Sequence, residues 1–259
     1  MGGDPTRGVS STKLARVVRA TAAGAQPDAT AHPEAHRRTN WLRDVILGGQ
    51  DGLVNILGII LGVVAAGGSR TVLLATGFAA AITESISMGA VGYTSTASER
   101  DYYQAERERE AAEIDRMPEA ERREIHDIYA TKGFEGALLD QVVDTITANR
   151  ERWLQTMMDE ELHLQPVENA AILRSSFVIF LATLVGHLIP LVPFIWLDRT
   201  PAMVLALVLS AIVLFGVGAY TAITLVGDWR TSGVRMLLIG LGAAGIGFFI
   251  ARLFHTAGA

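Results

Sequence analysis

Five long apolar stretches constrain the fold of this chain more than any other feature. They lie at about residues 44–68, 71–96, 171–197, 202–226 and 233–254. Each is long enough to cross a bilayer, which takes roughly 20 apolar residues in a helix. Half of the 259 residues are hydrophobic, and they gather in these stretches, whereas a soluble domain would spread them out. The sequence therefore predicts an all-α integral membrane protein with five transmembrane helices.

The connections between these stretches are short except for one. Residues 67–70 alone join the first two stretches, which predicts a tight helical hairpin. Pro190 and Pro193 fall near the end of the third stretch, and proline removes a helical hydrogen bond, so we expect that helix to kink or end there. The long connection is residues 98–165, which interrupt the apolar pattern.

Basic residues set the expected orientation. In a five-span arrangement, the arginines of the first 43 residues, those of residues 98–165, and Arg230 and Arg235 all fall on one side. An excess of Lys and Arg marks the cytoplasmic side, so the N-terminus and the insertion are expected inside and the C-terminus outside. Residues 1–40, in which Ala, Thr, Pro and Gly are scattered among basic residues, are expected to form a mobile tail.

The insertion is acidic and helix-prone. Between Glu99 and Glu161 the chain has 18 Asp or Glu residues against 9 Lys or Arg, which argues against nucleic acid as a partner. One helix is expected to continue from the second apolar stretch, a second to start at Pro118, and a third to run from about residue 134 to residue 164 with a break near residue 149. The expected domains are transmembrane helices 1 and 2 at 41–97, a three-helix cytoplasmic domain at 98–165, and transmembrane helices 3 to 5 at 166–259.

Three short motifs within the insertion offer ligands for a metal ion. They are Glu110-x-x-Glu113, Glu121-x-x-Glu124 and Met157-Met158-x-x-Glu161. Residues three apart lie on one face of a helix, so each Glu pair can aim two carboxylates at one cation. A solvated charged face is the alternative reading of each pair taken alone.

The kinds of ligand narrow the choice of metal. The chain has no cysteine, which leaves carboxylate, methionine and histidine side chains as ligands. Oxygen ligands alone suit magnesium, calcium or manganese, whereas a set that includes thioether sulfur favours first-row transition metals such as ferrous iron.

Polar residues also line one face of the first two membrane stretches. Asp51 lies on the same face of the first stretch as Gly58 and Gly62, and the Gly-x-x-x-Gly spacing permits close helix packing. Glu84 and Met88 lie one turn apart on the second stretch. Ionised residues are costly within a membrane and commonly mark ion pathways, so Asp51, Glu84 and Met88 are the predicted transport pathway.

The sequence from Trp41 onward resembles the vacuolar iron transporter family, whose members move ferrous iron and sometimes manganese out of the cytosol. The resemblance is carried by Asp51-Gly52-Leu53-Val54-Asn55, by Ser87-Met88 followed by Tyr93-x-Ser95-x-x-Ser98-Glu99, and by Trp153-x-x-x-Met157-Met158-x-x-Glu161-Leu162. It implies a homodimer with five spans per subunit, a pathway at the subunit interface, and exchange of metal against protons.

The resemblance also implies which residues bind metal, and this chain departs from the family pattern at one position. The residues implied to bind metal in the cytoplasmic domain are Glu110, Glu113, Glu121, Glu124, Met157, Met158 and Glu161, while Asp51 and Met88 match pathway positions. Many relatives carry a Glu four residues after the Met of the second span, where this chain has Gly92. We expect Glu84, one turn on the other side of Met88, to take over its role.

These features predict a transporter and no enzyme. The acidic domain would capture Fe2+, and possible bound ions also include Mn2+, Zn2+ and Co2+. No prosthetic group is expected. Asp51 and Glu84 would then alternate between binding metal and binding a proton. The membrane would be the plasma membrane in a prokaryote and the vacuolar membrane in a eukaryote. His126 and His163 are expected to form solvated ion pairs, and His187 to satisfy a carbonyl freed near Pro190.

Two alternatives remain open from the residues. Glu160-x-x-His163 has the spacing found in di-iron carboxylate bundles, so a membrane-anchored ferroxidase is one of them, although the chain has no second Glu-x-x-His. The other is a metal-buffering scaffold whose spans serve only as an anchor, which leaves Asp51 and Glu84 without a role.

Overall fold

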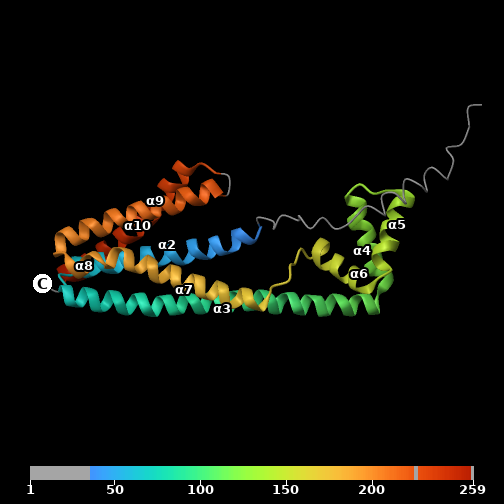
Figure 1. Cartoon of the computed structure of the whole chain (residues 1–259), viewed down its shortest axis with the longest axis horizontal. Coiled ribbons are helices and arrows are strands. Elements are labelled where there is room, and N and C mark those ends of the chain that lie inside the picture. The colour runs from blue at the N-terminus through green and yellow to red at the C-terminus, as the bar shows by residue number, and fades with distance from the viewer. Residues whose placement is uncertain (1–35, 225–226, 258–259) are drawn as a thin grey trace, which may run out of the picture. The chain divides into compact units, whose positions relative to one another are not determined.

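The computed structural model describes residues 36–224 and 227–257, and its regular structure in those residues is entirely helical. The chain separates into two units, residues 1–40 and 41–259, and the following description concerns the second. Of the tail expected at residues 1–40, residues 1–35 lie outside the described residues, and residues 36–40 are helical and belong to α2. Figure 1 labels the α-helices. The helices are α2 (His36–Ala65), α3 (Arg70–Arg116), α4 (Pro118–Thr131), α5 (Gly136–Thr147), α6 (Arg150–Thr156), the π-helix η1 (Met157–Glu161), α7 (Asn169–Leu191), α8 (Pro193–Trp196), α9 (Arg199–Thr224) and α10 (Trp229–Ala257).

Five of these helices are long and apolar enough to cross a membrane, as the sequence predicts. They contain the segments Trp41–Ala65, Arg70–Arg116, Asn169–Leu191, Arg199–Thr224 and Trp229–Phe254. The third segment continues through Pro190 and ends at Leu191, and Pro193 opens the short helix α8, so the expected break at the two prolines is confirmed.

The helix α3 is 47 residues long and has no interruption (Figure 1). Ser69 caps its start by accepting a hydrogen bond from the Val72 backbone N–H at 3.3 Å. Its first part is apolar and its last part, from about Ser98, is rich in charged residues. A bilayer needs only about 20 residues of a helix, so the charged part of α3 belongs to the insertion.

Small residues allow α3 and α7 to pack along their length. The buried face of α3 includes Gly77, Ser85, Gly89 and Gly92. A Cβ atom on Gly89 would lie 3.1 Å from Cβ of Phe180, and Ser176 on α7 donates a hydrogen bond to the Gly89 carbonyl at 2.7 Å. Close helix approach through small residues is the usual packing mode in membranes.

Glycines on α2 lie against two neighbouring helices. Gly52 packs against α7, whereas Gly62 lies beside α10, where a Cβ atom on it would be 3.6 Å from Cβ of Ala251. A Cβ atom on Gly247 of α10 would lie 3.2 Å from the Gly58 carbonyl oxygen. The α2 and α10 backbones therefore approach closely beside Gly58, but the glycine that permits this approach is Gly247, since a Cβ atom on Gly58 would have no atom within 4 Å.

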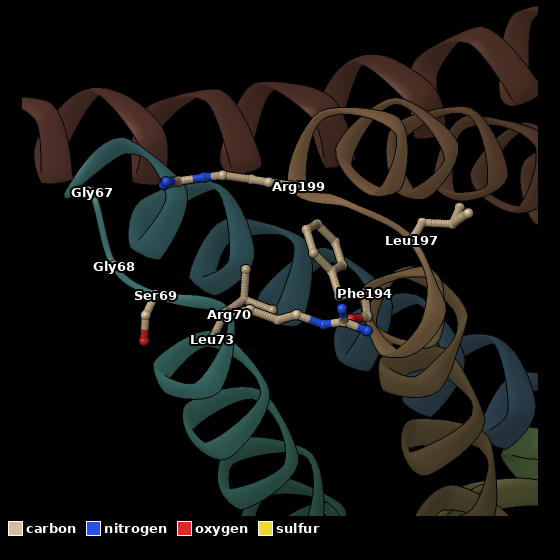
Figure 2. Close-up of a pocket in the computed structure, with 8 residues that line it drawn as sticks. All are labelled: Gly67, Gly68, Ser69, Arg70, Leu73, Phe194, Leu197 and Arg199. Atoms are coloured by element: carbon tan, nitrogen blue, oxygen red, sulfur yellow. The ribbon is translucent and has the colours of Figure 1, made fainter.

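Two arginines join the helix ends at a pocket of about 150 Å³ (Figure 2). Arg70 donates from Nε to the Phe194 carbonyl at 2.7 Å and also contacts the Ile195 carbonyl, while Arg199 donates to the Val64 carbonyl. These carbonyls lie at the C-terminal ends of α8 and α2, which favour positive charge. The arginines thus hold the α2–α3 hairpin against the α8–α9 connection.

The insertion follows the predicted helix ends closely, with one difference. Proline at position 118 opens α4, Gly133 with φ of +92° follows its end, and Asn149 caps α6 by accepting from the Arg152 N–H at 2.9 Å. The third helix was expected to run to residue 164, but it changes to a π-helix at Met157 and ends at Glu161. A π-turn contains one extra residue, and helical periodicity in a sequence does not reveal it.

A hydrophobic core holds the insertion together. Its buried members come from α3, α4, α5, α6 and η1, and they are Tyr103, Ile114, Ile125, Leu139, Val143, Ile146, Trp153, Leu154, Met157 and Met158. Ion pairs between Arg150 and Asp115 and between Arg107 and Glu151, each at 2.6 Å, connect α3 with α6. The packing brings α3, α4 and η1 into mutual contact.

Two candidate cation sites

Three glutamates of the insertion form a compact cluster. Glu110 and Glu113 lie one turn apart on α3, and Glu121 lies in the first turn of α4. One carboxylate oxygen from each lies within 4.8 Å of the others. Among the side chains that the structure describes, this is the one group of three acidic, His or Cys residues with such spacing. Carboxylate oxygens gathered in this way can bind a divalent cation.

The two innermost carboxylates are buried. Glu110 is 2% exposed and Glu121 is 4% exposed, and one oxygen of each lacks a hydrogen-bond partner among the described residues. Burial, contact with Glu121 and its negative charge raise the pKa of Glu110 to about 8. Burial likewise raises the pKa of Glu121, with a further contribution from Glu124. Buried carboxylates of this kind need either protons or a cation.

Glu124 and Glu161 lie at the exposed edge of the same cluster. Partial burial, then the charges of Glu124 and Glu121, raise the pKa of Glu161. The two Glu-x-x-Glu pairs differ at their second position, where Glu113 is half-buried and Glu124 is exposed. The predicted acidic residues do come together, with Glu110 and Glu121 at the centre.

The two methionines of the third motif are fully buried. Met157 and Met158 both have 0% exposure and belong to the core of the insertion, at the start of the π-helix. The π-turn brings Met157, Met158 and Glu161 into one five-residue element that contacts both α3 and α4. Thioether sulfur in this position would add a soft donor to a set of hard carboxylate oxygens.

The remaining acidic and histidine residues near this cluster have other partners. Glu160 pairs with Lys132, and Nδ1 of His163 lies 3.1 Å from the Asp159 carbonyl oxygen. His126 is exposed and pairs with Asp127 at 3.2 Å, as expected for a solvated ion pair. The Glu160-x-x-His163 pair that a ferroxidase would use therefore does not join the glutamate cluster.

A second polar group lies among α2, α3 and α7. Glu84 on α3 accepts a hydrogen bond from Asn55 Nδ2 at Oε1, and its Oε2 lies 2.9 Å from Nε2 of His187 on α7. Asp51, half-buried one turn before Asn55, interacts electrostatically with both Glu84 and His187. Three helices that are apolar enough to span a membrane thus place two carboxylates, an amide and an imidazole together.

The partners of His187 differ from the sequence-based expectation. Its Nδ1 lies 2.8 Å from the Thr183 carbonyl oxygen, whereas Pro190 frees the carbonyl of Gly186. Its other nitrogen faces Glu84, a contact between residues 103 positions apart that the sequence did not reveal. A histidine within an apolar stretch is itself a signal of function. This was the signal in the sequence that could have identified His187 as a candidate site residue.

Met88 lies on α3, half-buried and one turn from Glu84. The contacts of Gly92 with α7 explain why this chain lacks the glutamate that many relatives have at that position. Gly92 is buried against α7, and a Cβ atom on it would lie 2.7 Å from Cδ1 of Ile179 and 3.3 Å from Cα of Ser176. A glutamate does not fit at position 92 without movement of α7, so Glu84 is the carboxylate that α3 provides near Met88.

Together these features define a class: an all-helical, multi-pass membrane protein with carboxylates gathered both among its spans and in a helical insertion. A family model described as the VIT family matches residues 42–252. The chain belongs to this family, which consists of transporters and not enzymes.

Individual relatives agree with this assignment. Vacuolar iron transporter 1 of Tulipa gesneriana is 34% identical over 231 residues, which are 87% of this chain and 92% of that protein. Vacuolar iron transporter 1 of Oryza sativa subsp. japonica is 32% identical over 231 residues, or 87% of this chain and 90% of that protein. Vacuolar iron transporter 1 of Arabidopsis thaliana is 34% identical over 186 residues, or 71% of this chain and 74% of that protein.

Proposed function

We propose that this protein transports ferrous iron out of the cytosol, with manganese as a second substrate, in exchange for protons. The observation that carries the proposal is the polar group of Asp51, Asn55, Glu84 and His187 on three apolar helices. Carboxylates inside a membrane are costly and typically serve ion passage. The names of the relatives support iron as the substrate.

In this proposal, the insertion is a cytoplasmic domain that captures the metal before transport. Its excess of acidic residues attracts cations to the entrance. The cluster of Glu110, Glu113 and Glu121 supplies hard oxygens, and Met157 and Met158 supply soft sulfur. This mixture favours Fe2+, Co2+ or Zn2+ over Mg2+. Metal binding then releases the protons that the buried carboxylates hold.

The hydrogen bonds of His187 support the proposed proton exchange. Because a carbonyl oxygen only accepts, Nδ1 carries its hydrogen to Thr183, and Nε2 and the Glu84 carboxylate must share a second proton at 2.9 Å. A cation that binds Glu84 displaces this proton. Metal moving one way and protons moving the other way would use the same carboxylate.

The pathway would run between two copies of the chain. Next to Met88 on α3, Ser87, Val91 and Ser95 are exposed in the single chain. A second copy covering this face would enclose Asp51, Glu84 and Met88 in a homodimer. The membrane would be the plasma membrane in a prokaryote and the vacuolar membrane in a eukaryote, with the insertion on the cytoplasmic side.

The test is a flux assay with the purified chain in liposomes. Fe2+, kept reduced without oxygen, is added outside vesicles that contain one metal-sensitive and one pH-sensitive dye, with and without an imposed pH gradient. We expect metal entry coupled to proton movement, and we expect Asp51→Asn to abolish both. Asp198→Asn is the matched control, because Asp198 is an exposed carboxylate in the connection between α8 and α9.

Different results of this assay would contradict transport, proton exchange or the role of Asp51. Absence of metal flux in the unmodified protein would refute transport, and flux without proton movement would refute exchange. Normal flux in Asp51→Asn would remove Asp51 from the pathway. In a separate assay in the presence of oxygen, oxygen consumption on addition of Fe2+ would support the ferroxidase alternative instead.

A further inference from the structure

The His187 ring occupies a closely fitted position in α7. It has 0% exposure, and both ring nitrogens have partners, at 2.8 Å to the Thr183 carbonyl and at 2.9 Å to Glu84. Gly52 on α2 lies directly against the ring, since a Cβ atom there would be 2.7 Å from His187 Nδ1. Burial of a polar ring costs free energy unless its hydrogen bonds are made, and here the backbone of α7 and the side chain of Glu84 make them.

This arrangement is the one that orients a histidine for metal binding. Histidine ligands generally donate one ring N–H to a backbone carbonyl or carboxylate, which fixes the tautomer and directs the other nitrogen at the metal. In this chain Nδ1 donates to Thr183, so Nε2 carries the available lone pair or a proton toward Glu84. Asn55 holds the other oxygen of the same carboxylate.

We propose that Nε2 of His187 and Oε2 of Glu84 bind the transported cation together, as adjacent ligands of one coordination sphere. The inference rests on the proposed transport of a divalent metal, and it adds a nitrogen donor that the sequence reading did not include. Two ligands at about 2.1 Å from a metal and at right angles are about 3.0 Å apart. The observed separation of 2.9 Å therefore suits a metal ion with little movement of either side chain.

A nitrogen donor predicts an order of preference among metals. Carboxylate oxygens alone bind Mn2+ well, whereas imidazole favours the later metals of the first row, such as Co2+ and Zn2+. His187 would then set the preference for these metals, while Glu84 and Asp51 serve every divalent cation. Loss of the imidazole is expected to change the ratio of metals transported.

The first test detects the nitrogen ligand directly in the full chain. Cu2+ bound through one imidazole nitrogen gives a characteristic signal from the other ring nitrogen in pulsed electron paramagnetic resonance. The protein is prepared with His187 as its single histidine, and the five residues changed to glutamine are His32, His36, His126, His163 and His255. We expect the imidazole signal in this protein and its loss when His187→Gln is added. Absence of the signal while His187 is present would overturn the proposal.

The second test measures selectivity in liposomes with otherwise unmodified protein. We expect His187→Gln to lower Co2+ uptake by about tenfold or more and Mn2+ uptake by less than about threefold. His163→Gln is the control, because this exposed histidine bonds only a nearby backbone carbonyl in the described structure. An equal loss for both metals, or no loss for either, would mean that His187 does not bind the cation. If the unmodified protein moved no divalent metal, the proposed function would fail, while the Cu2+ signal would still decide the ligand.

Discussion

Glu110 and Glu121 approach each other from consecutive helices, and each buries one carboxylate oxygen that has no hydrogen-bond partner within the described residues. A buried polar atom without a partner costs free energy, and a charged one costs more. A divalent cation held between these carboxylates would give buried carboxylate oxygens a partner. Metal binding would therefore relieve a local free-energy cost of burying these carboxylates.

Replacement of Glu113 and Glu121 by glutamine preserves size and removes two negative charges from the cluster. We expect the affinity of the full-length protein for Co2+, measured by calorimetry, to fall by at least about tenfold, which corresponds to about 1.4 kcal/mol. The matched control replaces Asp140 by asparagine and Glu135 by glutamine, since both are exposed. Asp144 is a poorer control because it pairs with Arg122. Equal effects of the two double variants would indicate a diffuse charged surface and no specific site.

The pKa of Glu110 predicts how stability depends on pH. The folded chain holds the Glu110 proton up to about pH 8, whereas an unfolded glutamate releases it near 4.5. The native state therefore binds more protons between these values, and stability falls as pH rises from about 4.5 through 8. We expect the melting temperature of the metal-free insertion to decrease across this pH range. Trp153 fluorescence measures it in a variant in which Trp41, Trp196 and Trp229 are changed to Phe.

Two comparisons check this pH dependence. Glu110→Gln should reduce it strongly, because glutamine does not titrate. Added Co2+ should reverse it, with metal affinity rising as pH increases, since protons and metal compete for the same oxygens. An unchanged slope in Glu110→Gln would show that other groups produce the effect.

Met158 offers a test of the sulfur ligand that keeps the fold. Met158→Leu conserves volume and apolarity in a fully buried position, so we expect a loss of stability below about 1.5 kcal/mol. Affinity for Co2+ should fall several-fold more than affinity for Mn2+, because the softer metal gains more from a thioether. Leu154→Met is a control for core packing in the same cluster. A similar change for both metals would assign Met158 to packing alone.

Gly52 and Gly58 provide a matched pair on α2. A Cβ atom on Gly52 would lie 2.4 Å from the Thr183 carbonyl oxygen, whereas one on Gly58 would have no atom within 4 Å. We expect Gly52→Ala to separate α2 from α7, displace His187, destabilise the protein by about 1–3 kcal/mol and abolish flux. Gly58→Ala should fold and transport normally. Thermal unfolding and liposome flux measure both, and normal flux in Gly52→Ala would show that this contact is dispensable.

Local signals in the sequence were sufficient for much of the architecture. The five spans follow from apolar length, and the ends of α4 and α6 follow from Pro118, Gly133 and Asn149, because these residues act on the helix that contains or adjoins them. The glutamates of the cluster were also predictable as a set, since helical spacing places each pair on one face.

Tertiary packing decided the rest. Glu113 and Glu124 occupy the same position of identical motifs, yet Glu113 is half-buried and Glu124 is exposed, because burial depends on which helices cover each residue. The contact between Glu84 and His187 joins two helices across 103 positions, and no local pattern encodes it. The π-turn at Met157 adds a residue to a helical turn, which the helical periodicity does not show.

The continuity of α3 has a mechanical consequence. Glu84 and Glu110 belong to one helix of 47 residues, about 70 Å long at 1.5 Å per residue, and no proline occurs between its ends. Sharp bends in helices usually need proline, a glycine–serine pair, a π-bulge or an inserted group, and α3 runs as one uninterrupted helix past its own glycines and serines. A twist of α3 about its own axis would therefore move Glu84 and Glu110 together. Metal binding to the insertion and rearrangement among the spans would then be coupled through one rigid helix.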